Sequence, residues 1–317
     1  MRTVTAIALA AFVVCACKER PAEPPPAVPR QGIELVSRGA IPHQKLRYQL
    51  TKGVTTPIEL ESDADVSMGS IQRVMPTSVL RMEISADDVL PDGNVKMRTR
   101  VVSASGRERA NATVPVETVT AQAMMLGGLE ITGTLTPRGR VQDTRLAGGG
   151  KDLPAKAVQQ IEQMLKAAEE VAMPLPEPGV GVGAIWRVRK DVVLLGVKLE
   201  TITLVELTAI DGPRVTYLLR TEVRGDDQTA DIDGLKAEVM HIRGGGTGKG
   251  VIDLGRMAMT GEQEVELSFD VSAMDHRTTA KMRLVQRAKS TAAPAAQGPP
   301  PAAQGAQSAG QGAQSAP

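Results

Sequence analysis

The feature that most constrains the fold of this 317-residue chain is a repeated alternation of apolar and polar residues. The alternation is strict from Val265 to Val271 and recurs, with one glycine, from Leu129 to Leu135. Shorter examples run from Leu46 to Leu50 and from Leu80 to Ile84. Because successive side chains of a strand point to opposite faces, this period predicts antiparallel strands with one buried and one solvated face. The turn signals between strands are PDGN at 91–94, PRG at 137–139, DGP at 211–213 and DG at 233–234.

We therefore expect a mainly β body over residues 32–289, made of curved antiparallel sheet that forms either two similar halves or a half-barrel. The two halves, about 32–150 and 180–289, are suggested by Ile131–Asp143 and Ile242–Asp253. Both stretches carry an isoleucine, a glycine two residues later, a threonine, a basic–glycine pair and an aspartate. Each is interpreted as strand, glycine-rich turn and strand. Chance likeness of two hairpins is the alternative, since the chain has 31 glycines.

One segment, about 152–173, departs from the period of two. It opens with Asp152 as a helix N-cap and an early proline, and it stops before Pro174. Its apolar positions fall on one helical face, and they are Val158, Ile161, Leu165, Ala168 and Ala172. The pattern predicts one long amphipathic helix packed on the sheet.

The N-terminus has the layout of a secretory signal over residues 1–16. Arg2 supplies a positive end, and the uncharged run Val4–Val14 is shorter than the roughly 20 apolar residues of a membrane-spanning helix. The only two cysteines follow at once, in Val14-Cys15-Ala16-Cys17. This order of features resembles the lipobox of bacterial lipoproteins. The resemblance implies that Cys17 becomes the first residue of the mature chain and carries lipid.

Ordinary signal cleavage at the same bond is the alternative, and it would leave Cys17 as a free thiol. The lipoprotein resemblance implies a membrane anchor in the cell envelope, with the body facing the periplasm or the exterior. Lys18 follows the cysteine in place of the aspartate that resembles an inner-membrane retention signal in some bacteria, which slightly favours the outer membrane.

The segments that flank the body have the composition of a spacer and a tail. Residues 17–31 are proline-rich, which favours an extended linker between anchor and body. Residues 290–317 carry no charge, repeat GAQSA and hold no large apolar side chain. A segment of this kind cannot bury enough surface to offset the entropy of ordering, so we predict a disordered tail.

Charge and motif content exclude several classes of function. The chain has 37 Lys and Arg against 36 Asp and Glu, and loss of Arg2 with the signal leaves 36 against 36, which argues against a nucleic-acid partner. The stretch Arg243–Gly250 lacks both the leading glycine and the hydroxyl residue of a phosphate-binding loop. The three histidines have no metal-ligand spacing. We expect no cofactor, no metal and no enzyme activity, although a hydrolase with paired carboxylates stays open.

The leading interpretation is a non-enzymatic, membrane-anchored envelope lipoprotein whose body binds an apolar ligand such as lipid between sheet and helix. Val158, Ile161 and Leu165 would then line the ligand. A sheet with a long helix on its concave side is similar to the layout of lipid-carrying bacterial lipoproteins. The alternative is a structural or assembly lipoprotein that docks another envelope protein and has no ligand cavity. The two hypotheses differ in whether the space beside the sheet is open or filled by side chains.

Overall fold

The computed structural model describes residues 32–149, 173–194, 196–232, 235–273 and 276–290. Within these ranges the chain forms a single antiparallel sheet of fourteen strands and one helix, α1 (Val116–Met124). The strands are β1 (Gly32–Ser37), β2 (Thr55–Met68), β3 (Ile71–Val74), β4 (Thr77–Val89), β5 (Val95–Arg107), β6 (Glu130–Leu135), β7 (Val141–Gly148), β8 (Ile185–Leu194), β9 (Val197–Asp211), β10 (Arg214–Arg224), β11 (Gln228–Ile232), β12 (Leu235–Asp253), β13 (Ala258–Ala273) and β14 (His276–Ser290).

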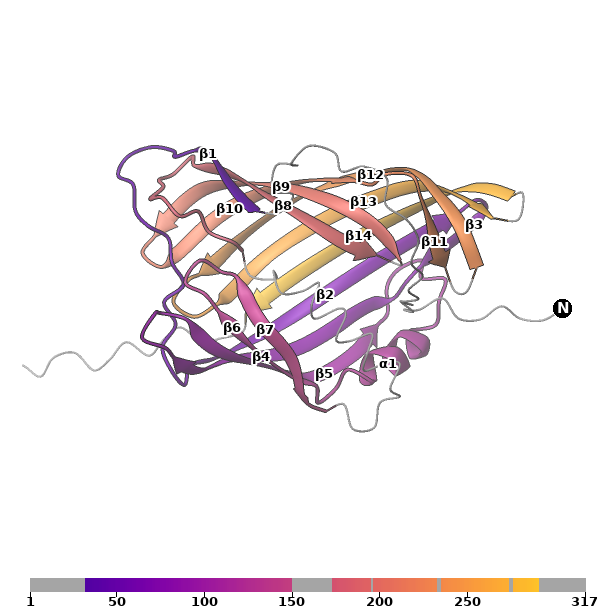
Figure 1. Ribbon diagram of the computed structural model, residues 1–317. Helices are drawn as coiled ribbons and strands as arrows, with labels where there is room; N and C mark the ends of the chain where they lie inside the picture. Colours follow the sequence, from indigo (N-terminus) through magenta and orange to yellow (C-terminus); the bar gives the residue numbers. More distant parts are fainter. Residues whose placement is uncertain (1–31, 150–172, 195, 233–234, 274–275, 291–317) are drawn as a thin grey trace, which may run out of the picture.

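The order of strands makes one continuous, open sheet (Figure 1). It runs β1-β8-β9-β10-β12-β13-β14-β2-β4-β5-β6-β7, with β11 paired to β12 and β3 paired to β2 beside this path. Most neighbours are consecutive in the chain, but β14 pairs with β2 and β1 pairs with β8. The predicted mainly β, curved antiparallel architecture is confirmed. The described residues of the two predicted halves, 32–150 and 180–289, share this one sheet.

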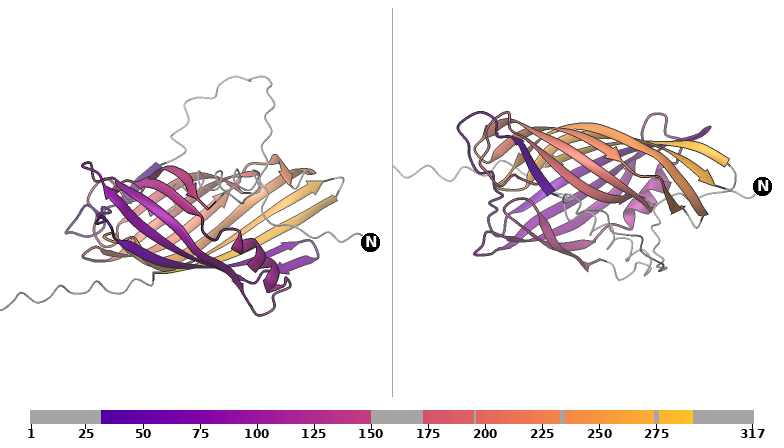
Figure 2. Two further views of the ribbon diagram at one scale, coloured as in Figure 1. Left: turned by 90° about the horizontal axis from the view of Figure 1, so that it is seen from below. Right: turned by 45° about the horizontal axis from the view of Figure 1, so that its top comes forward.

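The curvature of the strands gives the sheet a concave and a convex face (Figure 2). One cavity is lined both by Leu60 of β2 and by Val188 of β8, strands that are far apart in the sheet order, so these residues mark the concave side. Leu60 lies opposite Ala288 of β14 and Leu80 of β4, which continues the apolar row across three strands. The alternation in the sequence thus becomes an apolar concave face because the register keeps like positions side by side.

The convex face of β13, β14, β2 and β4 carries a network of ion pairs. Arg283 reaches Glu264 (2.6 Å) and Asp65 (3.7 Å), and Arg287 reaches Asp63 (2.8 Å). Further pairs on this face are Arg109–Asp65, Arg107–Glu61 and Arg81–Glu59. Cross-strand pairs of opposite charge stabilise neighbouring strands, so the polar positions of the alternation hold this face together in water.

Two irregular segments, 44–50 and 173–180, close one end of the curved sheet, and we call them the end plug. Leu46, Tyr48 and Leu175 of the plug are buried with Trp186 in the largest core cluster, which joins β5 and β6 to β8–β10. The Trp186 indole N–H donates to the carbonyl of Pro174 (3.0 Å). We call the side of the curved sheet with β5 and β6 and the side with β8–β10 its two arms. The end plug therefore connects the two arms through buried side chains.

The prediction of a strand at Leu46–Leu50 is wrong, although its burial pattern is right. Leu46 and Tyr48 are buried as the alternation requires. However, the Tyr48 N–H donates to the carbonyl of Pro137 (2.8 Å) and the Gln49 N–H donates to the carbonyl of Leu254 (3.0 Å). Because these acceptors belong to two separate turns, the segment is extended without joining a ladder.

The predicted glycine-rich hairpin at Ile242–Asp253 is also wrong, because this stretch is the C-terminal part of the single long strand β12. It pairs with β10 on one side and with β13 on the other, and both pairings extend from Arg243 to Asp253. The stretch Ile131–Asp143 does form strand, turn and strand, from β6 into β7. The two stretches therefore differ in structure, which removes the support they gave to a repeat of two halves.

The predicted helix at about 152–173 lies outside the described residues, apart from its last residue, Met173. The helix that is described, α1, was not predicted. It packs on β5, where Val119 and Ala123 are buried and Thr120 Oγ1 accepts a hydrogen bond from the Gly106 N–H (2.9 Å). A Cβ at position 106 would contact Val116 and Thr120, so glycine permits this close approach.

Candidate functional site

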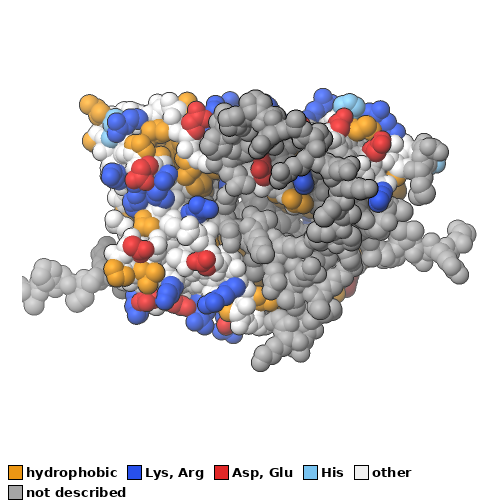
Figure 3. Space-filling model, viewed as in Figure 1, with side chains coloured by type: hydrophobic (Ala, Val, Ile, Leu, Met, Phe, Trp, Pro, Cys, Tyr) orange, Lys and Arg blue, Asp and Glu red, His pale blue; other side chains and the backbone are white. Residues whose placement is uncertain are grey.

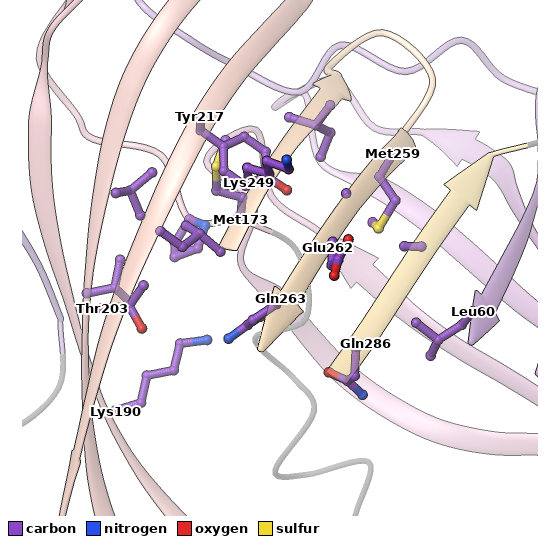
Figure 4. Close-up of a pocket in the computed structure, with 17 residues that line it drawn as sticks. Leu60, Met173, Lys190, Thr203, Tyr217, Lys249, Met259, Glu262, Gln263 and Gln286 are labelled. Carbon is purple, nitrogen blue, oxygen red and sulfur yellow. The ribbon is translucent and has the colours of Figure 1, made fainter. Parts of the chain in front are cut away.

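A cavity of about 360 Å³ lies on the concave face, and we call it the concave cavity (Figure 4). Its volume is within the range of small-molecule ligand sites. Strands β8, β9, β10, β12, β13, β14 and β2 contribute to it, together with Met173 and Pro174 of the end plug. Its main apolar lining residues are Leu60, Val188, Val205, Leu219, Ile252 and Met259.

A row of polar side chains crosses the floor of this face. Gln263 of β13 lies opposite Gln286 of β14, which lies opposite Ser62 of β2, and Ser62 lies opposite Ser78 of β4. The two glutamines line the concave cavity. Each amide group can both donate and accept hydrogen bonds, so this row of side chains offers polar contacts on an otherwise apolar concave face.

Tyr217 forms part of the cavity wall, next to two glycines in neighbouring strands. It lies opposite Gly250, and Gly250 lies opposite Gly261 in the next strand. A Cβ at position 250 would fall 2.7 Å from Tyr217 Oη, so glycine leaves room for the tyrosine ring. Burial raises the pKa of Tyr217 above the usual value of 10.0.

A second cavity, of about 670 Å³, adjoins the first. It lies between β1 and β8 on one side and the β6–β7 turn on the other, where the two arms of the sheet approach each other. Pro174, Val188 and Lys190 line both cavities. We call the second cavity the basic mouth, after its charged lining residues, which are Arg47, Arg138, Arg140, Arg189 and Lys190. On the left part of the face in Figure 3, Lys and Arg side chains are interspersed with Asp and Glu side chains.

Acidic groups are scarce in both cavities. Among the described residues that line them, Glu262 is the one carboxylate, and it lies opposite Lys249 across β12 and β13. Within the same ranges no group of three His, Cys, Asp or Glu side chains is placed to hold a metal ion. The part of the chain that the structure describes also has no helix long and apolar enough to cross a membrane.

A compact polar cluster lies elsewhere, at the bulge in β12. Asp270 accepts hydrogen bonds from Arg277 Nη2 (2.7 Å) and Thr279 Oγ1 (2.7 Å), and it lies 3.1 Å from His241 Nδ1. The bond from Arg277, with those from Thr279 and His241, holds the pKa of Asp270 well below its usual range. These groups are mutually paired on an exposed surface, which is typical of a structural cross-strand cluster.

The predicted site residues lie outside the described residues. This applies to Cys17 and to Val158, Ile161 and Leu165. The cavity residues that sequence reasoning missed are Lys190, Tyr217, Gln263 and Gln286. One local signal was present, because Gln286 interrupts the apolar positions Met282, Leu284 and Ala288 of an alternating stretch.

No family model matches the chain, and no curated protein matches it. Among solved structures, the chain is similar to one titled "Lipid-protein interactions in lipovitellin", with a TM-score of 0.44 and 11% identity. The match covers 78% of this chain and 26% of that chain, so this chain spans about a quarter of the length of the lipovitellin chain. A likeness of this size does not identify a function.

Proposed function

We propose that the body binds an apolar ligand, such as the acyl chain of a lipid, in the concave cavity. The observation that carries this proposal is an open cavity lined by aliphatic side chains from both arms of one curved sheet. Buried apolar contact contributes roughly 25 cal/mol per Å² of surface removed from water, so an acyl chain gains free energy along such a lining. Within the described residues the edge strands β1 and β7 are not paired to each other, and we propose that a ligand enters on this side.

We further propose that the protein is held in the cell envelope by lipid on Cys17 and is not an enzyme. The support for the anchor is the lipobox resemblance at Val14–Cys17. The support for a binding role is the composition of the two cavities, in which the described residues present a single carboxylate and no carboxylate pair. The alternative of an assembly protein without a ligand cavity is less well supported, since the concave cavity is open.

The anchor and the ligand are tested together by mass spectrometry of the protein purified gently from its own membranes. The denatured chain should carry a diacyl or triacyl mass increment that disappears in Cys17→Ser. Under native conditions it should carry a further lipid mass that is lost on denaturation. An unmodified mature chain would refute the anchor and leave the binding proposal standing.

Binding is tested separately with a matched pair of substitutions and a fluorescent acyl probe. Ala288 lines the concave cavity, so Ala288→Met should fill part of it and weaken probe binding several-fold. Ala209 is exposed on β9, so Ala209→Met makes the same chemical change away from the cavity and should leave binding unchanged. A wild-type protein that carries no lipid and binds no probe would overturn the proposal.

A further inference from the structure

We propose that the ligand is an anionic amphiphile whose acidic headgroup lies in the basic mouth while its acyl chain lies in the concave cavity. This inference rests on the proposed function and specifies its ligand. It follows from the charge of one cavity, the apolar lining of the other, and the residues that they share.

The charged residues that line the basic mouth are all positive. Its lining includes five Lys and Arg residues and no Asp or Glu, in a chain whose formal net charge is only +1. Two acids pair with these cations from outside the lining. Glu177 lies 3.1 Å from Arg47 and 3.3 Å from Arg138, and Glu200 lies 3.5 Å from Arg189. Among the four arginines, Arg47 and Arg138 share Glu177 and Arg189 has Glu200, so Arg140 adds positive charge at this opening that no acid among the described residues balances.

Two arginines of the basic mouth are held by hydrogen bonds within the protein, and a third is not. Arg47 donates through Nη1 to the carbonyls of Leu46 and Pro176 and through Nη2 to Glu177, so it holds the end plug in place. Arg138 donates through Nε to the carbonyl of Leu175 (3.2 Å). By contrast, the exposed side chain of Arg140 has no hydrogen bond or ion pair within the described residues. Arg140 is therefore the guanidinium best placed to bind a ligand oxygen.

The passage between headgroup site and acyl site runs past Lys190. Lys190 lines both cavities, as do Val188 of the same strand and Pro174 of the end plug. In the close-up, Lys190 and Gln263 extend toward one another across the concave cavity (Figure 4). A carboxylate or phosphate at this junction meets an ammonium group and an amide, while a chain continuing inward meets Val205, Leu219 and Met259.

This arrangement fits an amphiphile better than a free anion or a neutral lipid. A free anion would use the mouth and leave the aliphatic lining of the concave cavity in contact with water. A neutral lipid would fill the apolar lining and bring no counter-charge to Arg140. An acyl chain with a carboxylate or phosphate headgroup matches both cavities at once.

The inference is tested by calorimetric titration of the full-length protein with three probes below their micellar concentrations. Dodecyl phosphate carries the chain and the charge, dodecylphosphocholine carries the same chain with that charge cancelled by choline, and inorganic phosphate carries the charge alone. We expect dodecyl phosphate to bind about tenfold more tightly than dodecylphosphocholine, the effect of one charge-assisted hydrogen bond. Inorganic phosphate should bind more weakly than both.

The variants are chosen in matched pairs. Arg140→Gln and Lys190→Gln should each weaken dodecyl phosphate binding about tenfold and leave dodecylphosphocholine binding within about twofold. The controls are Arg220→Gln and Lys281→Gln, which remove exposed cations outside both cavities and should leave both affinities unchanged. Higher salt should reduce the difference in affinity between dodecyl phosphate and dodecylphosphocholine.

The outcomes separate this inference from the proposed function. Equal binding of the two amphiphiles, unaffected by Arg140→Gln and Lys190→Gln, would overturn the headgroup site while acyl binding stands. Inorganic phosphate as tight as dodecyl phosphate would identify a plain anion site and overturn the amphiphile. Failure of every amphiphile to bind would overturn the proposed function and this inference together.

Discussion

At the scale of single residues, the two tyrosines of the chain mark the junction between the packed core and the concave cavity. Tyr48 is fully buried in the end plug, and its hydroxyl donates to the carbonyl of Met173 (3.2 Å). Tyr217 packs against the same cluster and faces the cavity. Burial raises the pKa of both phenols, with the nearby Tyr217 adding to the effect on Tyr48. Both phenols therefore stay neutral to a higher pH in the folded protein than in the unfolded chain.

We predict that neither tyrosine ionises near pH 10 in the folded protein, whereas both titrate at about pH 10 after denaturation. The unfolded chain loses these protons first, so the contribution of both groups to stability is complete below pH 10 and is lost as the pH rises above it. Absorbance titration of tyrosinate, followed beside circular dichroism, measures this. A full tyrosinate signal near pH 10 from a folded protein would contradict the prediction.

Asp63 is the most enclosed acid of the convex network, with a side-chain exposure of 12%. Burial raises its pKa, but the hydrogen bonds from Thr77 Oγ1 (2.6 Å) and Arg287 Nη1 (2.8 Å), with the charges of Arg287 and Arg109, outweigh burial and lower the pKa overall. Because the folded pKa lies below the unfolded one, this group stabilises the fold above the unfolded pKa of about 4 and loses that effect as the pH falls.

Asp63→Asn should lower the free energy of unfolding by about 1–3 kcal/mol at pH 7. The difference between variant and wild type should shrink as the pH falls from about 5 toward 2, because the wild-type carboxylate becomes protonated. Urea unfolding across this range gives both results. Asp87→Asn is the control, since Asp87 pairs with Arg98 on a more exposed surface and should change stability by less than about 1 kcal/mol. An Asp63→Asn difference that is independent of pH would show that the charge of Asp63 is not the cause.

At the scale of elements, the long strand β12 shows how glycine shapes the sheet. Gly244, Gly246, Gly248 and Gly250 alternate along it and so share one face. A Cβ at Gly246 would overlap the carbonyl oxygen of Glu264, and one at Gly244 would overlap that of Glu266. The glycines therefore allow β12 to approach β13 closely along the curved part of the sheet, as glycine does at strand bends.

Gly246→Ala should destabilise the protein by about 1–3 kcal/mol or more, because the added methyl group has no space beside a neighbouring carbonyl. Gly148→Ala is the matched control, since a Cβ there meets Glu130 at an ordinary 3.4 Å. The midpoint of denaturant unfolding compares the two variants. Equal stability of Gly246→Ala and Gly148→Ala would mean that β12 shifts away from β13 without cost.

At the scale of the whole molecule, the last strand joins the two parts of the sheet. Strands β2 to β7 form one set of neighbours and β8 to β13 form another, and β14 lies between β13 and β2. Its pairing with β2 extends from Met68 to Ile58, and Ser290 Oγ at its end donates to the carbonyl of Pro57 (3.2 Å). Contacts of this sequence separation require a long loop to close, which costs entropy and slows folding.

Two truncations test the role of β14. A chain that ends at Ser290 should keep its free energy of unfolding within about 0.5 kcal/mol, because the predicted disordered tail adds no core. A chain that ends at residue 275 should lose cooperative unfolding, because both β13 and β2 then have an unpaired edge. Urea denaturation followed by circular dichroism compares the two chains. A cooperative transition in the shorter chain would show that the two sets of strands fold without their connection.

The sequence by itself determined the local pattern of this protein. The alternations at Leu80–Ile84, Leu129–Leu135 and Val265–Val271 fall on strands, apart from Leu129 just before β6, because a period of two is a property of each segment alone. The turns at 91–94, 137–139 and 211–213 lie between strands for the same reason. The apolar alternation also identified the burial of Leu46 and Tyr48.

Only the tertiary structure decided which segments pair and which side chains meet. The extended backbone of 46–50 bonds to two turns, and the glycines of β12 continue a strand, because their partners lie far away in the sequence. The helix α1 depends on the space that Gly106 leaves on β5. The cavities combine Leu60 with Val188 and Arg47 with Arg189, and no local pattern relates residues so distant. Burial and charge at the site are set by strand order and register, which are properties of the whole sheet.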